Sequence, residues 1–259
     1  MSETITVKIN SGVETIVLNR PDSYNAFNRE MALALQKAID EGASNNTVRA
    51  ILITGKGKAF SSGQDLKEAT DPEGPGLNRI LLEHFNPIIR KIRKTPKPVV
   101  VAVNGIAAGA GANLALVGDV VIASESASFV QAFSKIGLIP DSGGTLTLPR
   151  LVGFAKASAW MITAEKIGAQ EALASGMIYK VFPDDKFYDK ALEIAEGLAK
   201  KPTRAFAGIK EAINKSTFYG LDEQLEAERA FQVEMGETHD FKEGVSAFIE
   251  KRNPKFKGE

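Results

Sequence analysis

One aspartate and two loops of small residues are the parts of this 259-residue sequence that could carry out chemistry. Asp141 lies in the turn IPDSGG, where its carboxylate could take up and return a proton. The Gly-Ala-Gly turn at residues 109–111 would leave backbone N–H groups open to a ligand. The loop FSSGQDL (60–66) offers a second such group at Gln64. Because two backbone donors on one oxygen form an oxyanion hole, the pattern favours a proton-transfer site.

Each feature also has a purely structural explanation. Asp141 could be the N-cap of a helix that begins in SGGTLTLPRL, a role that lowers the pKa of the carboxyl group and makes it a poorer base. A base instead needs a partly apolar pocket, which nearby residues could provide: Phe133, Ile136, Leu138 and Ile139. The glycine turn could serve close packing of a strand on a helix, and FSSGQDL could be an ordinary turn.

No other catalytic or metal-binding motif accompanies these loops. The sequence has no cysteine, which excludes disulfides, thiolate nucleophiles and cysteine-bound metals. His84 and His239 have no partners at motif spacing, so a packing role at the surface or in a helix is expected. Residues 105–111, GIAAGAG, resemble GxGxxG but lack an acidic residue placed to hold a ribose. We therefore expect no metal and no dinucleotide.

Composition and charge bound the class of protein. Lys+Arg and Asp+Glu both number 32, so the net charge is zero, and 44% of the residues are apolar. This balance is typical of a globular protein and gives no sign of a nucleic-acid surface. The first residues, MSETITVKIN, do not resemble a signal peptide, and no apolar run is long enough to span a membrane. We expect a cytoplasmic protein without nucleic-acid or membrane partners.

The elements that must position the two loops alternate between strands and helices. Apolar and β-branched runs predict strands at 3–10, 12–19, 50–55, 98–105 and 119–124, with a hairpin turn at Ser11-Gly12. Helical spacing predicts helices at 28–43 and 77–94, and the polar stretch 69–76 is expected to be mobile and close to the ligand. Each loop then follows a buried strand, which indicates a compact α/β core. From about residue 154 the pattern is mostly helical, as expected for a cover or an oligomer interface.

The complete set of motifs resembles the crotonase (enoyl-CoA hydratase/isomerase) superfamily over about residues 4–256. The resemblance rests on NRPDSYNAF (19–27), GKGKAFSSGQDLKE (55–68), PKPVVVAVNGIAAGAGANLAL (96–116), DVVIAS (119–124), FSKIGLIPDSGGT (133–145) and EGVSAFIEKRNPKF (243–256). It implies an α/β fold with a ββα spiral core that binds acyl-CoA (1–200) and a helical trimerisation region that also covers the CoA site (201–259). It further implies a homotrimer or a dimer of trimers, with CoA as part of the substrate and no separate cofactor.

The same resemblance implies roles for individual residues. The thioester oxygen would lie between the N–H groups of Gln64 and Ala110, where the family usually has glycine in place of Ala110. The substrate and its CoA portion would contact Ser62, Gly63, Asp65, Leu66, Lys67, Gly109 and Phe133. Phe248 and Lys251, one helical turn apart on one face, would contact CoA bound to a neighbouring subunit.

The catalytic positions narrow the activity that the resemblance implies. Family hydratases use two glutamates, and the corresponding positions hold Asn113 and Phe133. Adding water requires one group to activate it and another to deliver a proton, so hydratase activity is not expected. Asp141 matches the position used by relatives that shift double bonds or attack aryl-CoA substrates. A single carboxylate suits a 1,3-proton shift in which the oxyanion hole holds a dienolate.

Within the superfamily, SGQDL, AVNGIAAGAGANLAL, FVQAFSKIGLIPDSGGT and EGVSAFIEKRNPKF resemble the ring epoxyphenylacetyl-CoA isomerases of phenylacetate degradation. That resemblance implies opening of an epoxide to oxepin-CoA, or movement of a 3,4-double bond to the 2,3-position, with Phe133 as an apolar wall. Three alternatives stay open. The first is a generic hydratase-like or dienoyl-CoA isomerase activity. The second is nucleophilic attack by Asp141 on an aryl-CoA, for which the supporting histidine would be expected at Asn86, two residues from His84. The third is acyl-CoA binding without catalysis.

Overall fold

Two β-sheets form the framework of the computed structural model, which describes residues 4–259. The larger sheet has the strand order β1-β2-β3-β5-β7-β10 and the smaller one β4-β6-β8-β9. The strands of the larger sheet are β1 (Ile5–Asn10), β2 (Val13–Leu18), β3 (Ala50–Gly55), β5 (Val99–Val103), β7 (Val120–Ser124) and β10 (Lys180–Phe182). Those of the smaller sheet are β4 (Ala59–Ser61), β6 (Ile106–Ala108), β8 (Ser128–Val130) and β9 (Lys166–Gly168).

The chain passes repeatedly from the large sheet to the small sheet and then into helices. β3 is followed by β4, β5 by β6, and β7 by β8, each pair separated by a short turn. β3, β5 and β7 run parallel in the larger sheet, and β4, β6 and β8 run parallel in the smaller one, where β9 is antiparallel to β8. The predicted hairpin is also confirmed, since β1 and β2 are antiparallel and join through Ser11 and Gly12, both with positive φ. The result is the predicted ββα spiral.

The helix between β4 and β5 contains an unexpected wide turn. The predicted helix 77–94 consists of α3 (Gly76–Arg79), the π-helical segment η2 (Ile80–Phe85) and α4 (Asn86–Lys94). Pro87, just beyond the π segment, has no N–H to donate to the preceding turn. Gln36 of α1 (Arg29–Ser44) donates instead, to the carbonyl oxygens of Glu83 (2.7 Å) and His84 (3.2 Å).

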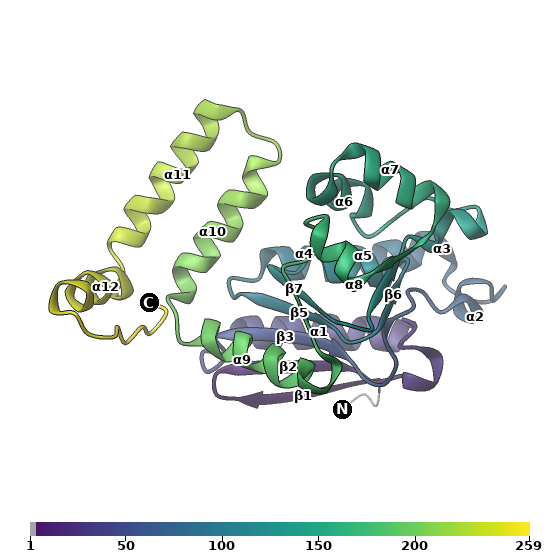
Figure 1. Ribbon diagram of the computed structural model, residues 1–259, viewed down its shortest axis with the longest axis horizontal. Coiled ribbons are helices and arrows are strands. Elements are labelled where there is room, and N and C mark those ends of the chain that lie inside the picture. The colour runs from purple at the N-terminus through teal and green to yellow at the C-terminus, as the bar shows by residue number, and fades with distance from the viewer. Residues whose placement is uncertain (1–3) are drawn as a thin grey trace.

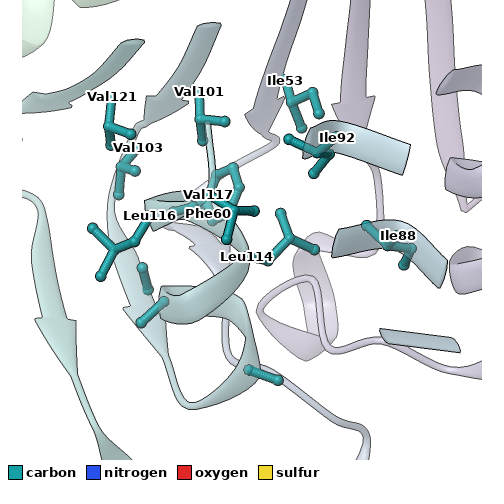
Figure 2. Close-up of a cluster of buried hydrophobic side chains, with 14 of the residues drawn as sticks. Ile53, Phe60, Ile88, Ile92, Val101, Val103, Leu114, Leu116, Val117 and Val121 are labelled. Atoms are coloured by element: carbon teal, nitrogen blue, oxygen red, sulfur yellow. The ribbon is translucent and has the colours of Figure 1, made fainter. Parts of the chain in front are cut away.

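The core lies on both faces of the large sheet, which explains why its central strands are apolar throughout. On one face, Ile53, Val101, Val103 and Val121 belong to the same apolar cluster as Ile88 and Ile92 of α4 and as Leu114 of α5 (Ala110–Leu116), as Figure 2 shows. On the other face, alternate strand residues pack against α9 (Phe187–Ala199): Leu52, Val100 and Ile122. Burying each large aliphatic side chain contributes roughly 1.5–3 kcal/mol.

The remaining helices lie at the periphery. α2 (Leu66–Ala69) follows β4, α6 (Gly144–Val152) and α7 (Phe154–Thr163) follow β8, and α8 (Ala169–Ala174) follows β9. The C-terminal helices α10 (Thr203–Ser216), α11 (Leu221–Gly236) and α12 (His239–Glu250) stand to one side of the sheets (Figure 1). Lys210 ties α10 to the core through a 2.7 Å ion pair with Asp119. Within residues 4–259, no helix combines the length and the apolar character needed to cross a membrane.

A buried acid on the second strand of the hairpin gives a prediction about stability. Glu14 of β2 is 2% exposed, and its Oε2 has no hydrogen-bond partner in the described part of the chain. Burial, with a smaller contribution from the charge of Glu41, raises its pKa from 4.5 to about 7 against the opposing charge of Lys97. The folded state therefore binds this proton more tightly than the unfolded chain, so stability falls as pH rises from about 4.5 to about 7.

Replacing Glu14 with glutamine is expected to stabilise the fold at pH 8 but hardly at pH 5. At pH 8 the parent protein carries a buried carboxylate whose Oε2 atom accepts no hydrogen bond within residues 4–259, and the neutral isostere removes a cost of about 2 kcal/mol. At pH 5 the glutamate is itself neutral in the folded state. Urea unfolding of both proteins at the two pH values checks this, and an equal difference at both would contradict it.

Candidate active site

The predicted site residues gather around one cavity of about 830 Å³ between the smaller sheet, the helix 76–94 and the turn before α6. All of them except Phe248 and Lys251 line it: Ser62, Gly63, Gln64, Asp65, Leu66, Lys67, Gly109, Ala110, Phe133 and Asp141. The other walls are mostly apolar and include Leu77, Ile80, Leu81, Phe85, Ile136, Leu138 and Ile139. The cavity therefore suits an apolar ligand that presents one polar group to the loops.

The two loops meet at Gly63, which brings the two predicted N–H donors to one place. Gly63 has a φ of +92°, and a β-carbon at this position would lie 2.9 Å from the Ala108 oxygen and 3.3 Å from the Ala110 nitrogen. Only glycine satisfies both the backbone angle and the close approach. Within residues 4–259, the N–H groups of Gln64 and Ala110 have no backbone acceptor. Their position on the cavity wall suits the predicted oxyanion hole.

The segment NRPDSYNAF holds the first loop in place, a function that the sequence did not reveal. The N–H of Phe27 donates to the Gly63 oxygen (2.7 Å), and the N–H of Asp65 donates to the Phe27 oxygen (2.9 Å). Asn25 is fully buried and donates to the Ala59 oxygen (2.8 Å). Arg20 forms an ion pair with the Asp65 carboxylate (3.0 Å). These contacts join residues about forty positions apart, so no local spacing could have predicted them.

Asp141 lines the same cavity, and it is not a helix cap. Helix α6 begins at Gly144 with Gly143 as its N-cap, so the alternative that Asp141 caps the helix is wrong. The Ser142 hydroxyl donates to Asp141 Oδ1 at 2.8 Å. Burial raises the pKa of the Asp141 carboxyl group above its ordinary value, and the hydrogen bond from Ser142 opposes that rise. A raised pKa brings a carboxylate closer to the range of a useful proton shuttle.

The two positions that hold glutamate in family hydratases have other surroundings here. The Phe133 ring is 6% exposed and faces Gly109, where a β-carbon would lie 3.8 Å from its Cζ atom. Asn113 is 1% exposed and does not line the cavity. Its Nδ2 instead donates to the main-chain oxygen of Asp141 (2.8 Å). The sequence identified Asn113 only as a missing acid, because its contact with Asp141 spans 28 residues of chain.

Phe248 and Lys251 lie away from this cavity. Phe248 is on α12 and is 86% exposed. Helix α12 ends at Glu250, and Lys251 has a φ of +55°, so the expectation that the two residues share a helical face is wrong. Lys251 is the C-cap of α12. Its backbone is in the left-handed conformation that commonly ends a helix, and its N–H group donates to the Ala247 and Phe248 oxygens. Their contact with CoA of a neighbouring subunit stays a prediction.

The histidines and possible metal ligands are elsewhere. His84 is fully buried in the π segment, with Nε2 3.4 Å from Arg29 Nη1, and burial lowers its pKa. This agrees with the expected packing role inside a helix. In the part of the chain that the structure describes, no cluster of three or more His, Asp or Glu side chains could hold a metal ion.

The ββα spiral, with an apolar cavity lined by both small-residue loops and by the half-buried Asp141, has the features expected of a crotonase-type enzyme. The profile of the enoyl-CoA hydratase/isomerase family matches residues 8–259, and the chain belongs to this family. The 1,2-epoxyphenylacetyl-CoA isomerase of Escherichia coli (strain K12) is 46% identical over 261 residues, covering 100% of both chains. A probable enoyl-CoA hydratase of Rhodobacter capsulatus is 47% identical over 255 residues, covering 98% of each. The crystal structure of an enoyl-CoA hydratase from Bacillus anthracis has a TM-score of 0.91 and 35% identity, covering 99% of this chain and 100% of that one.

Replacing Ser142 with alanine is expected to move the acid limb of the pH–activity profile to higher pH. The Ser142 hydroxyl stabilises the ionised form of Asp141, so its loss raises the pKa of that carboxyl group further. If the base form is the active one, activity then disappears at a higher pH as the solution is acidified. Initial rates from pH 5 to 9 test this, and a limb that stays in place or moves to lower pH would count against it.

Proposed function

We propose that this protein is an acyl-CoA isomerase in which Asp141 is the only acid/base. The observation that carries the proposal is the difference between the two carboxylates lining the cavity. Asp65 is ion-paired with Arg20 and caps α2, whereas Asp141 has a raised pKa and no cationic partner in residues 4–259. Asp65 is thus held in structural contacts, while the apolar pocket around Asp141 lets its carboxyl group both accept and release a proton.

In this mechanism the substrate thioester oxygen accepts hydrogen bonds from the Gln64 and Ala110 N–H groups. The Asp141 carboxylate removes a proton from C2 of a 3-enoyl-CoA, and the electron pair moves onto the thioester oxygen to give a dienolate. The dienolate collapses to a 2,3-double bond while the Asp141 carboxyl group returns the proton to C4. The two amides act mainly on the charged intermediate, which is where their stabilisation lowers the barrier.

Two observations support an isomerase over a hydratase. Asn113 and Phe133 supply no carboxylate, and Asp65 is held by Arg20, so within residues 4–259 the cavity wall offers no second free acid for water addition. The cavity walls are mostly apolar, with Phe85, Phe133 and Ile80 among them, which suits a ring or chain without charge. The 46% identity to a 1,2-epoxyphenylacetyl-CoA isomerase favours conversion of epoxyphenylacetyl-CoA to oxepin-CoA as the specific reaction.

We also propose a homotrimer or a dimer of trimers in the cytoplasm. Large apolar side chains are exposed on the C-terminal helices and on the turn between α10 and α11, as an oligomer interface requires: Ile209, Ile213, Phe218, Leu221, Leu225, Val233, Phe241 and Ile249. In such an assembly Phe248 and Lys251 would reach the CoA of a neighbouring subunit.

The test is an assay of the purified protein with four substrates: epoxyphenylacetyl-CoA, a 3-enoyl-CoA, a dienoyl-CoA and crotonyl-CoA. We expect isomerisation with deuterium exchange at the α-carbon, and negligible hydration of crotonyl-CoA. Rapid hydration of crotonyl-CoA would favour a hydratase. Solvent oxygen-18 in Asp141 after one turnover would favour nucleophilic catalysis. Acyl-CoA binding without exchange in any substrate would favour a non-catalytic protein.

A further inference from the structure

A chain of two buried carboxamides ends on the backbone of the proposed base. Gln131 Nε2 donates to Asn113 Oδ1 at 2.8 Å, and Asn113 Nδ2 donates to the Asp141 main-chain oxygen at 2.8 Å. Gln131 and Asn113 are 2% and 1% exposed, and neither lines the cavity. Their side chains therefore do not touch a bound substrate directly, and the atom that their hydrogen bonds reach is the main-chain oxygen of Asp141.

These two hydrogen bonds fix the orientation of the Asn113 carboxamide group. Its oxygen accepts from Gln131, so its nitrogen faces the Asp141 carbonyl oxygen. Gly144 leaves room for this group, since a β-carbon there would overlap the Asn113 carboxamide. The Gln131 Oε1 atom is buried and has no hydrogen-bond partner within residues 4–259. Leaving a buried carbonyl oxygen unpaired costs about 1–3 kcal/mol, so the interaction with Asn113 is kept at some expense to stability.

The turn that carries Asp141 needs such a support. Ser142 and Gly143 both have positive φ (53° and 76°), and this conformation is unfavourable for serine by about 1–2 kcal/mol. Inside the turn, the Asp141 oxygen accepts only one further hydrogen bond, from the Gly144 N–H (2.9 Å). The direction of the Asp141 side chain follows from its backbone, so a change in the turn displaces the carboxylate relative to the substrate.

We propose that Asn113, oriented by Gln131, is the positioning residue of Asp141. The residue that replaces a hydratase acid has become part of the support for the isomerase base. The inference rests on the proposed function of Asp141. A displacement of a reacting group by about 1 Å can cost on the order of 100-fold in rate, so partial relaxation of the turn should cost about tenfold.

The test compares two neutral replacements of similar size, Asn113→Leu and Gln131→Met. Asn113→Leu removes the donor to Asp141 and is expected to lower kcat about 10- to 30-fold with KM within about twofold. Gln131→Met leaves the donor in place but frees its orientation, and a smaller loss of kcat is expected. The double variant should be no slower than Asn113→Leu, because both residues act through one hydrogen bond. A matched control is Asn214→Leu, which removes a bracing asparagine bonded to Arg93 outside the cavity and should leave kcat within twofold.

A second comparison separates positioning from a general loss of structure. In an Asp141→Asn background, adding Asn113→Leu should change the residual α-proton exchange less than twofold, whereas a structural defect would lower it further. Thermal unfolding confirms that each variant is folded. If Asn113→Leu does not fold, Gln131→Met is used for the test instead. Near-normal turnover of Asp141→Asn would overturn the proposed function itself. An inactive Asp141→Asn together with full activity of the folded Asn113 and Gln131 variants would overturn this inference alone.

Discussion

Replacing Asp141 with asparagine is expected to lower kcat of isomerisation by about 10³-fold and to lower deuterium exchange at the α-carbon to a similar extent. General acid–base catalysis by one positioned group contributes roughly 10²–10⁴-fold, and here the same carboxyl group would serve both proton transfers. Asparagine keeps the size of the side chain and can still accept from Ser142, so the turn should be preserved. Binding of an acyl-CoA should change little, because the cavity walls and both amide donors remain.

The matched control for this prediction is Asp184→Asn. Asp184 is an aspartate that accepts hydrogen bonds from Ser126 and does not line the cavity. Its replacement should leave kcat within about twofold of the parent. Proton NMR of substrate incubated in deuterium oxide measures exchange directly, without dependence on product release. Asp141→Asn with near-normal exchange would mean that another group carries the proton.

Replacing Gly63 with alanine is expected to lower kcat about 100-fold. The new β-carbon would lie 2.9 Å from the Ala108 oxygen and 3.3 Å from the Ala110 nitrogen, so the two loops must separate. Separation moves the Gln64 and Ala110 N–H groups apart, and an oxygen between them loses one hydrogen bond. Losing one oxyanion-hole donor typically costs about 2.7–4 kcal/mol.

Gly176→Ala separates this geometric effect from backbone strain. Gly176 has a φ of +78°, close to the +92° of Gly63, so a side chain is unfavourable for the backbone at both positions. A β-carbon at Gly176 would meet only the Leu151 oxygen, at an ordinary 3.4 Å. Its replacement should lower thermal stability with kcat nearly unchanged. An equal loss of kcat in both variants would assign the effect to strain rather than to the position of the donors.

The sequence predicted the parts of the site that lie within one short segment. The small loop residues around Gly63 and Gly109, and the aspartate in a tight turn, were recognisable because backbone exposure and turn chemistry depend on neighbours in sequence. The three-residue strands β4, β6 and β8 were missed, because so short a segment cannot show a period of two. These strands form the smaller sheet, and β4 and β6 lead into the two loops. The sequence therefore did not predict the sheet on which the loops are held.

Supporting contacts across long stretches of chain could not be predicted. Asn25 and Arg20 hold a loop that begins about forty residues later, and Asn113 meets Asp141 across 28 residues. Single-residue patterns contain no information about such pairs. The helix at 77–94 was predicted at its correct place. The π segment within it depends on a distant contact, because Gln36 of another helix donates to the Glu83 and His84 carbonyl oxygens.

The wide turn at residues 80–85 gives this chain a simple route to altered selectivity during evolution. Ile80, Leu81 and Phe85 lie on the wall of the acyl cavity, at the beginning and the end of the π segment. Because the π turn holds about one residue more than an α turn, removing one residue between them would convert the segment to an ordinary α-helix and leave the orientation of its two ends nearly unchanged. A single deletion would thereby change only the side chains that residues 80–85 present to the acyl group, while the flanking helices, the sheets, the amide donors and Asp141 stay where they are.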